Sequence, residues 1–212
     1  MEATNEPISL PLPTIRRYPL YLRAIRRKIA NGETDISSAV LAEELGLDPV
    51  LMRKDLAMSG AVGRPRRGYP ARELLEALNR ALGWDNVTEA ALIGAGSLGH
   101  ALLGFKGFAE HNLRIVVAFD ANPELQGTTV HGVQIHSPDE LKKLIKRLAL
   151  KIGILCVPNA AAQECADLLV EAGVKGIWNF TTVQLNLPPE VKMAQVDLAE
   201  SLAVLSHAIT GA

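Results

Sequence analysis

Two hydrophobic patterns divide this chain of 212 residues. Before residue 83, apolar residues recur every three or four positions among polar and basic ones, which is typical of amphipathic helices. After residue 86, short apolar runs alternate with helical patterns, which is typical of parallel strands joined by helices. The pattern therefore predicts two domains, 1–83 and 84–212, with a linker at residues 83–86.

Turn residues separate the helices predicted for the N-terminal domain. Residues 1–13 contain three prolines and no periodicity, so we expect a mobile tail before a helix that starts near Thr14 and stops at residues 31–32. Pro19 belongs in the first turn of this helix or kinks it. A helix at residues 72–82 is expected to end the domain.

Between them, the sequence predicts a helix, a turn and a second helix. Ser37 and Ser38 can cap the first, which ends at Gly46, and Asp48 followed by Pro49 marks the start of the second. This is the order of a helix-turn-helix, in which the second helix enters the major groove of DNA.

Basic residues occupy positions that suit contact with DNA. Arg53 and Lys54 lie near the start of the second helix, where such side chains reach guanine edges or phosphates. Residues 60–69 place three arginines between glycines, which is typical of a hairpin wing beside a recognition helix. We predict a winged helix-turn-helix with these contacts: Ser38, Val50, Arg53, Lys54, Ser59, Arg64, Arg66 and Arg67. Two simpler interpretations stay open, a helical bundle for protein contact and loop arginines that only face solvent.

Charge supports a polyanion partner for the N-terminal part. The formal net charge of the whole chain is −1. From Arg16 to Arg72, however, twelve Lys and Arg face six Asp and Glu, a balance of +6 that the remainder offsets with −7. A basic module on a nearly neutral protein favours double-stranded DNA as its partner.

The C-terminal domain opens with a dinucleotide-binding pattern. An apolar run at 90–93 leads into Gly94, Ala95, Gly96, Ser97, Leu98 and Gly99, then a helical pattern, and a second apolar run ends in Asp120. The glycines permit a tight turn, close approach of a pyrophosphate and close packing of helix on strand. Asp120 is expected to accept hydrogen bonds from ribose hydroxyls and to repel a 2′-phosphate, which favours NAD(H). The simpler alternative is a glycine turn that binds no nucleotide.

Alternation of strands and helices continues to the end of the chain. Strands are expected at 133–135, 152–157, 176–180 and 191–196, and helices at 138–148, 160–172 and 198–209. This predicts a Rossmann fold, a doubly wound parallel sheet whose ligand lies at the C-terminal strand ends. Val157, Pro158, Asn179 and Phe180 lie at those ends. The last helix is apolar almost all round and needs burial on more than one side.

Other patterns exclude several classes of protein. No run of eighteen apolar residues and no cationic start followed by an apolar stretch is present, so we expect no membrane span, no signal peptide and a cytoplasmic location. Cys156 and Cys165 suit neither a zinc site nor a disulfide scaffold, and no metal is predicted. A direct thiol redox sensor stays an alternative.

Several stretches together resemble one family. They are Pro19-Leu20-Tyr21-Leu22-Arg23, Arg53-Lys54-Asp55-Leu56 before Ser59-Gly60, Arg67-Gly68-Tyr69, Gly107-Phe108, Ala118-Phe119-Asp120, Val157-Pro158 with Ala161-Ala162-Gln163, Gly176-Ile177-Trp178-Asn179-Phe180 and a late Val-Asp-Leu-Ala. Over about residues 14–209 the chain resembles the Rex family of bacterial redox-sensing repressors. The resemblance implies a homodimer that binds an inverted-repeat operator when NADH is low and leaves it when NADH replaces NAD+. It also implies that the terminal helix swaps onto the partner subunit.

Two positions depart from the family pattern. Residues 57–60 read Ala-Met-Ser-Gly where relatives usually carry an aromatic pair before glycine. Phe105 stands where relatives often carry a tyrosine, whose hydroxyl joins a switch formed by the equivalents of Arg23 and Asp197. A phenyl ring cannot donate that hydrogen bond, although we expect it near the nicotinamide. Asp197, followed by Glu200, also fits a helix cap.

Two other functions share the predicted fold. An NAD-dependent dehydrogenase has the same fingerprint, but little chain remains beyond the sheet for a substrate domain, and the histidines are poorly placed as a catalytic set. We therefore expect a regulator and not an enzyme. A sensor of another adenine nucleotide, such as coenzyme A, is the third interpretation; Asp120 argues against it.

Overall fold

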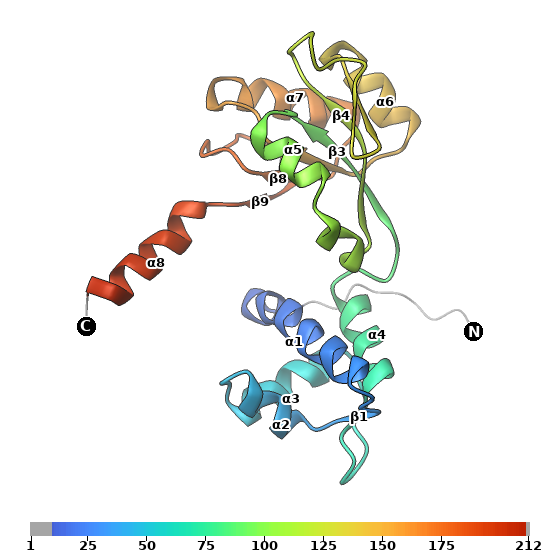
Figure 1. Ribbon diagram of the computed structural model, residues 1–212, viewed down its shortest axis with the longest axis vertical. Coiled ribbons are helices and arrows are strands. Elements are labelled where there is room, and N and C mark those ends of the chain that lie inside the picture. Colours follow the sequence, from blue (N-terminus) through green and yellow to red (C-terminus); the bar gives the residue numbers. More distant parts are fainter. Residues whose placement is uncertain (1–9, 211–212) are drawn as a thin grey trace. The chain divides into compact units, whose positions relative to one another are not determined.

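The computed structural model describes residues 10–210, and Figure 1 shows the helices and strands of this part of the chain. The chain forms two compact units, Met1–Asn86 and Val87–Ala212. The division lies three residues beyond the boundary expected from the sequence, at the end of the predicted linker. No helix of the described part is long and apolar enough to cross a membrane.

The first unit is a helical bundle with a small sheet. Its elements are α1 (Leu12–Ala30), β1 (Asp35–Ile36), α2 (Ser38–Glu44), α3 (Pro49–Met58), β2 (Tyr69–Pro70) and α4 (Ala71–Ala81), with β1 and β2 antiparallel. Tyr18, Tyr21 and Leu22 of α1 pack in one core with Leu56 of α3 and Leu78 of α4. These apolar contacts set the position of α3 against α1 and α4.

The start of α1 corrects one expectation. The helix begins at Leu12, within the segment expected to be a tail, and Pro13 occupies its first turn. Pro19 therefore lies inside the helix and not in its first turn. Residues 1–9 of the expected tail lie outside the described residues.

Local capping sets the helix-turn-helix geometry. The Ser37 hydroxyl accepts a hydrogen bond from Val40 N at 3.5 Å before α2. Asp48 Oδ1 accepts from Val50 N and Leu51 N at 2.8 Å each and so fixes the start of α3. Between the two helices, Gly46 has a φ of +64°. The predicted caps at Ser37 and Asp48 are thus confirmed.

The second unit is built on a seven-stranded sheet of order β5-β6-β4-β3-β7-β8-β9. The strands are β3 (Thr88–Ile93), β4 (Leu113–Phe119), β5 (Thr129–Val130), β6 (Val133–His136), β7 (Ile152–Leu155), β8 (Gly176–Asn179) and β9 (Lys192–Gln195). Only β5 pairs antiparallel, and the sequence did not predict it. From β6 to β9 this is the strand order of a Rossmann sheet, which reverses beside β3, as predicted.

Helices cover both faces of the sheet. They are α5 (Ser97–Leu103), η1 (Lys106–His111), η2 (Pro138–Glu140), α6 (Leu141–Arg147), η3 (Asn159–Ala161) and α7 (Ala162–Ala172), η denoting a 3-10 helix. Leu144 of α6 and Leu169 of α7 belong to one core, whereas Leu102 and Phe108 pack in another with Leu92. The helices expected at 138–148 and 160–172 each begin with a 3-10 turn.

The last helix, α8 (Leu198–Thr210), leaves apolar side chains exposed. Leu202, Val204, Leu205 and Ile209 are 61%, 69%, 59% and 71% exposed. Folded proteins rarely leave such an apolar surface uncovered.

Candidate nucleotide and nucleic-acid sites

The turn between β3 and α5 has the geometry that the glycine pattern predicts. Gly94 has a φ of +92°, and a Cβ there would lie 2.6 Å from the carbonyl oxygen of Cys156. A Cβ on Gly99 would overlap the carbonyl oxygen of Gly94. A Cβ on Gly96 would meet no atom within 4 Å. Packing therefore requires glycine at 94 and 99, while Gly96 borders open space.

Asp120 ties the end of β4 to this turn. Its Oδ2 accepts a hydrogen bond from Ala95 N at 2.7 Å, and its Oδ1 accepts one from Asn122 N at 2.8 Å. A carboxylate oxygen has more than one acceptor site, so both oxygens keep capacity for ribose hydroxyls.

A cavity of about 130 Å³ opens at the same strand ends. It is lined mostly by apolar side chains: Ile93, Gly94, Phe119, Asp120, Ala121, Pro138, Leu141, Val157, Pro158, Ala161, Cys165 and Leu168. Four of the predicted cofactor residues, Gly94, Asp120, Val157 and Pro158, thus come together around one hollow. Apolar walls with a carboxylate at one side suit an adenosine group.

The two cysteines are poorly suited to redox sensing. Burial raises the pKa of Cys156 to about 12. Burial, helped by the charge of Glu164, also raises the pKa of Cys165. Because the thiolate is the reactive form, these raised pKa values disfavour reaction of either thiol.

The structure gives Asn179 a different role from the predicted one. Its buried Nδ2 donates hydrogen bonds to Val183 O at 3.0 Å and to Gln195 Oε1 at 2.8 Å. Its Oδ1 accepts two bonds from Thr181, from N and from Oγ1, at 2.9 Å each. With its amide fully used, the side chain shapes the loop after β8 and has no group left for a ligand.

Phe105 and Phe180 lie at the two ends of a row of four aromatic rings. Phe105 packs on Phe108 with ring centroids 4.9 Å apart, Phe108 on Trp178 at 5.6 Å, and Trp178 on Phe180 at 5.0 Å. Phe105 is 56% exposed. The spacing of aromatic residues in the sequence carried no sign of this row, because its members come from separate elements.

On α3, the predicted recognition helix, Val50, Arg53 and Lys54 are all exposed. The next residue, Asp55, is buried and lies in a polar cluster that sequence reasoning missed. Arg17 of α1 donates to both Asp55 oxygens, from Nε at 2.6 Å and from Nη2 at 2.9 Å. Two further donors complete the cluster, Tyr21 at 2.6 Å and Thr14 at 3.0 Å.

This Asp55 cluster keeps the carboxylate ionised. Burial alone raises the pKa of Asp55, but the hydrogen bonds from Arg17, Tyr21 and Thr14 outweigh it and hold that pKa below its ordinary value. In turn the bond to Asp55 raises the pKa of Arg17. An ion pair with all of its hydrogen-bond partners present thus links α3 to α1.

The two predicted serine contacts are less accessible than the arginines. Ser59 is buried, and its hydroxyl donates to Leu56 O at 2.6 Å and accepts from Ala61 N at 3.3 Å. It therefore serves the end of α3. Ser38 is half-buried in the first turn of α2.

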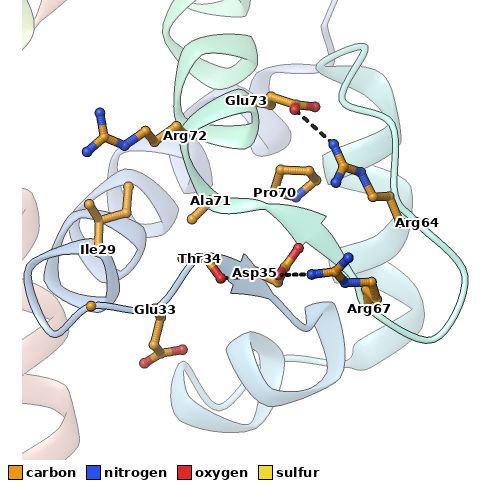
Figure 2. A pocket seen from close by; sticks show the side chains of 11 residues that line it. Ile29, Glu33, Thr34, Asp35, Arg64, Arg67, Pro70, Ala71, Arg72 and Glu73 are labelled. Atoms are coloured by element: carbon orange, nitrogen blue, oxygen red, sulfur yellow. Dashed lines mark hydrogen bonds and ion pairs between the residues drawn. The ribbon is translucent and has the colours of Figure 1, made fainter.

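The wing arginines are all exposed, but two of them have acidic partners. Arg64 pairs with Glu73 at 3.1 Å, and Arg67 pairs with Asp35 at 3.3 Å (Figure 2). Arg66 lies at the tip between them with a φ of +63°.

The residues of the predicted switch lie in different units. Arg23 is exposed on α1. Asp197 precedes α8, and its Oδ1 accepts a hydrogen bond from Ala199 N at 2.8 Å, which is the cap that its sequence context allowed. A pair between the two side chains stays a prediction.

Together these features define a two-domain regulator, in which a winged helix-turn-helix is joined to a Rossmann nucleotide-binding domain. Family models match both parts: "Putative DNA-binding protein N-terminus" over residues 9–57 and "CoA binding domain" over residues 85–183. The redox-sensing transcriptional repressor Rex of Treponema denticola is 42% identical over 91% of this chain and 92% of its own length. That of Lactobacillus gasseri is 40% identical over 94% of each. The chain belongs to the Rex family.

Solved structures agree with this assignment. The chain is similar to RSP, a Rex-family repressor, in complex with β-NAD+ and operator DNA, with a TM-score of 0.90, 34% identity, and coverage of 96% of this chain and 94% of that one. For RSP in complex with β-NADH the TM-score is 0.85, with 34% identity and 95% of each chain covered.

Proposed function

We propose that this chain is a homodimeric transcriptional repressor that senses the ratio of NADH to NAD+. It binds an inverted-repeat operator when NADH is low and releases the DNA when NADH binds. One observation carries the proposal: 96% of this chain matches RSP, whose structures hold either NAD+ with operator DNA or NADH. The chain has the two features that such a protein needs, an exposed basic helix α3 and a glycine turn beside Asp120.

In this proposal the nucleotide lies along the C-terminal ends of β3, β4 and β7. The backbone of residues 94–99 receives the pyrophosphate, with Gly96 giving the open approach that a Cβ would narrow. Asp120 accepts from the adenosine ribose, and Val157 and Pro158 hold the base in the cavity. The carboxylate repels a 2′-phosphate, so NAD(H) is preferred to NADP(H).

The nicotinamide end decides the signal, because NAD+ and NADH differ there in charge and planarity. A ligand shifts an equilibrium only through a difference in affinity for its two states. We place this ring near Phe105 and Phe180, at the ends of the aromatic row. Phe105 contributes apolar contact only, so the proposed pair of Arg23 with Asp197 responds without a hydrogen bond from residue 105.

Dimerisation covers the exposed face of α8. An apolar hollow of about 320 Å³ lies along β7, β8 and β9 and the start of β4, lined by Leu113, Ile152, Gly176, Ile177, Trp178, Lys192, Met193 and Ala194. We propose that α8 of a second copy packs on this surface through its exposed Leu202, Val204 and Leu205. A dimer also presents two recognition helices to two half-sites about 34 to 36 Å apart, or a multiple of that spacing.

A second ligand has to be tested because the family model over residues 85–183 is that of a CoA binding domain. Coenzyme A carries a phosphate on its ribose, and Asp120 lies where such a phosphate would be repelled. Calorimetric titration with NADH, NAD+, NADPH and coenzyme A separates the two ligands. Tight binding of coenzyme A with no binding of NADH would replace the proposed ligand.

The repressor function is tested by fluorescence anisotropy with a duplex that the wild-type chain selects from a random pool, at fixed salt. NADH should release the wild-type protein, whereas Gly96→Val should bind the duplex equally well and ignore NADH. A variant that still responded to NADH would refute the site assignment, and a wild-type chain that selected no inverted repeat would refute the function. Because the nucleotide acts as a signal, absorbance at 340 nm should show NADH unchanged after release.

A further inference from the structure

We infer that Arg66 is the wing residue that enters a narrow minor groove beside each operator half-site, while Arg64 and Arg67 brace the wing against its own domain. The inference rests on the proposed operator binding and assigns different tasks to three arginines that the sequence could not separate.

The first argument is the backbone at the wing tip. Arg64 N donates to Gly68 O at 2.6 Å, and Gly68 N donates to Arg64 O at 3.0 Å, so the two residues close the hairpin. Arg67 N also donates to Arg64 O, at 3.2 Å, which makes Pro65 and Arg66 the central residues of a tight turn. Pro suits the second position of such a turn, and the third needs a positive φ. Glycine adopts that conformation freely, but an arginine adopts it at a cost in free energy.

The stem of the wing, in contrast, is closely packed. A Cβ on Gly68 would overlap the carbonyl oxygen of Ile36 in β1, and one on Gly63 would lie 3.2 Å from the Tyr69 ring. The stem therefore has little freedom to move against the rest of the unit. A rigid stem with a strained tip holds the backbone of Arg66 at one place, from which its side chain projects, and strain of this kind is concentrated at functional positions.

Charge separates the three arginines further. Figure 2 shows Arg64 and Arg67 directed back across a groove of about 550 Å³ towards Glu73 and Asp35, with Arg72 pointing away from both. Each exposed pair stabilises the domain little by itself. Together they orient the two guanidinium groups away from the tip. Arg66 has no hydrogen bond or ion pair with any residue in the range 10–210.

An unpaired guanidinium on a narrow, projecting turn matches one kind of DNA surface. The minor groove of an A·T tract is narrow, its negative potential is enhanced, and arginine inserted there reads shape without contacting base edges in the major groove. Arginine suits this site better than lysine because its charge is more weakly hydrated. The wild-type chain should therefore prefer A·T pairs next to the half-sites, outside the base pairs that α3 reads.

The test uses the inverted repeat selected by the wild-type chain, with the pairs on both sides of each half-site made A·T, G·C or inosine·C. Inosine·C shows the major-groove acceptors of G·C but lacks the amino group of guanine in the minor groove. We expect wild-type affinity to fall about tenfold from A·T to G·C and to recover with inosine·C. Equal affinity for all three duplexes would overturn the inference and leave the repressor function intact, since the half-sites still bind.

The variants separate a side-chain contact from a turn requirement. Arg66→Gly removes the side chain and relieves the positive φ, so its melting temperature should stay equal or rise while its affinity for the A·T duplex falls about tenfold. Arg66→Lys should retain the salt dependence of binding but lose most of the preference for A·T. If Arg66 served the turn alone, Arg66→Gly would bind all three duplexes like the wild-type chain.

Arg64→Ala and Arg67→Ala are the matched controls on the same wing. Each removes a positive charge from the wing and should lower affinity for all three duplexes alike, but should keep the preference for A·T flanks, because Arg66 remains. A larger loss in either control than in Arg66→Gly, or loss of the A·T preference in a control alone, would assign the groove contact to that arginine. If no variant and no wild-type chain bound any duplex, the repressor function itself would fail.

Discussion

In the DNA-binding unit the proposed contacts are charged side chains that project from α3 and the wing, whereas in the nucleotide-binding unit most of them are backbone atoms of residues 94–99. The side chains of α3 depend on a support beneath them, the Asp55 cluster. The glycine turn depends on the absence of side chains. A site of the first kind therefore fails when a charge or its support is lost, and one of the second kind fails when space is filled.

Removing the support of α3 should have the largest effect. Asp55→Ala leaves the Arg17 charge without its partner in a largely buried place and should cost about 3 to 5 kcal/mol of unfolding free energy in the first unit. Tyr21→Phe removes a single hydrogen bond from the same carboxylate and should cost about 0.5 to 1.5 kcal/mol. Denaturant unfolding by circular dichroism measures both, and NADH titration should be unchanged in each. Equal small losses would show that the cluster does not hold α3.

The same carboxylate predicts that the first unit loses stability in acid. The pKa of Asp55 is lower in the folded chain than its ordinary value of 3.8. A depressed carboxylate contributes stability that is present above the unfolded pKa and is lost as pH falls through the folded pKa. The unfolding free energy of the first unit should therefore fall as the pH drops below about 3.8, and Asp55→Asn should flatten this dependence. Stability that is independent of pH in that range would contradict the assigned pKa direction.

In the nucleotide-binding unit, two neighbouring glycines should separate folding from binding. Gly99→Ala brings a Cβ onto Gly94 O and should cost about 1 to 3 kcal/mol of stability, because the close packing of α5 on the turn is lost. Gly96→Ala meets no protein atom and should leave the melting temperature unchanged while weakening NADH binding. Calorimetry and NADH titration of the pair give the answer. A stability loss in Gly96→Ala would mean that this glycine also serves the fold.

These glycines and the caps of α2 and α3 show which parts of the molecule could be predicted from sequence. A cap or a tight turn involves residues within a few positions of one another. The roles of Asp48, Gly46 and the glycines of residues 94–99 could therefore be predicted from the sequence. Asp55 and Arg17 are 38 positions apart in the sequence, and no local pattern predicts such a pair. Most of the Arg17 side chain is covered in the fold, although an arginine on an amphipathic helix is ordinarily exposed.

The same limit applies to two of the predicted site residues. Ser59 and Asn179 are polar residues beside predicted sites, and only their partners in the fold show that both serve the backbone. Strand β5 has two residues, too few to give an alternating pattern. The different conformations and partners of Arg64, Arg66 and Arg67 are likewise absent from a run of arginines.

Substitution of Arg53 or Lys54 on α3 tests directly the site that is made of charged side chains. An arginine that contacts a guanine through two hydrogen bonds is worth about 1 to 3 kcal/mol, and its loss relaxes specificity at one base. Loss of a residue that contacts a phosphate should instead reduce the salt slope, the slope of log affinity against log salt concentration, by about one and leave specificity unchanged. Anisotropy at several salt concentrations, with Arg53→Ala and Lys54→Ala, distinguishes a base reader from a phosphate contact. If neither change affected affinity or slope, α3 would not be the recognition helix.

The smallest effect concerns Asp197, where a helix cap and a switch compete as explanations. Loss of the cap on Ala199 N in Asp197→Ala should cost about 0.5 to 2 kcal/mol, whereas Asp197→Asn keeps a capping oxygen and loses only the charge. If Asp197 pairs with Arg23 in one ligand state only, both variants should shift the NADH concentration that releases half of the DNA, and in the same direction. The midpoint of release and the melting temperature are measured together on each protein. A shift in Asp197→Ala alone, in step with its melting temperature, would leave Asp197 as a cap, and the NADH signal would then reach the DNA-binding unit by another route.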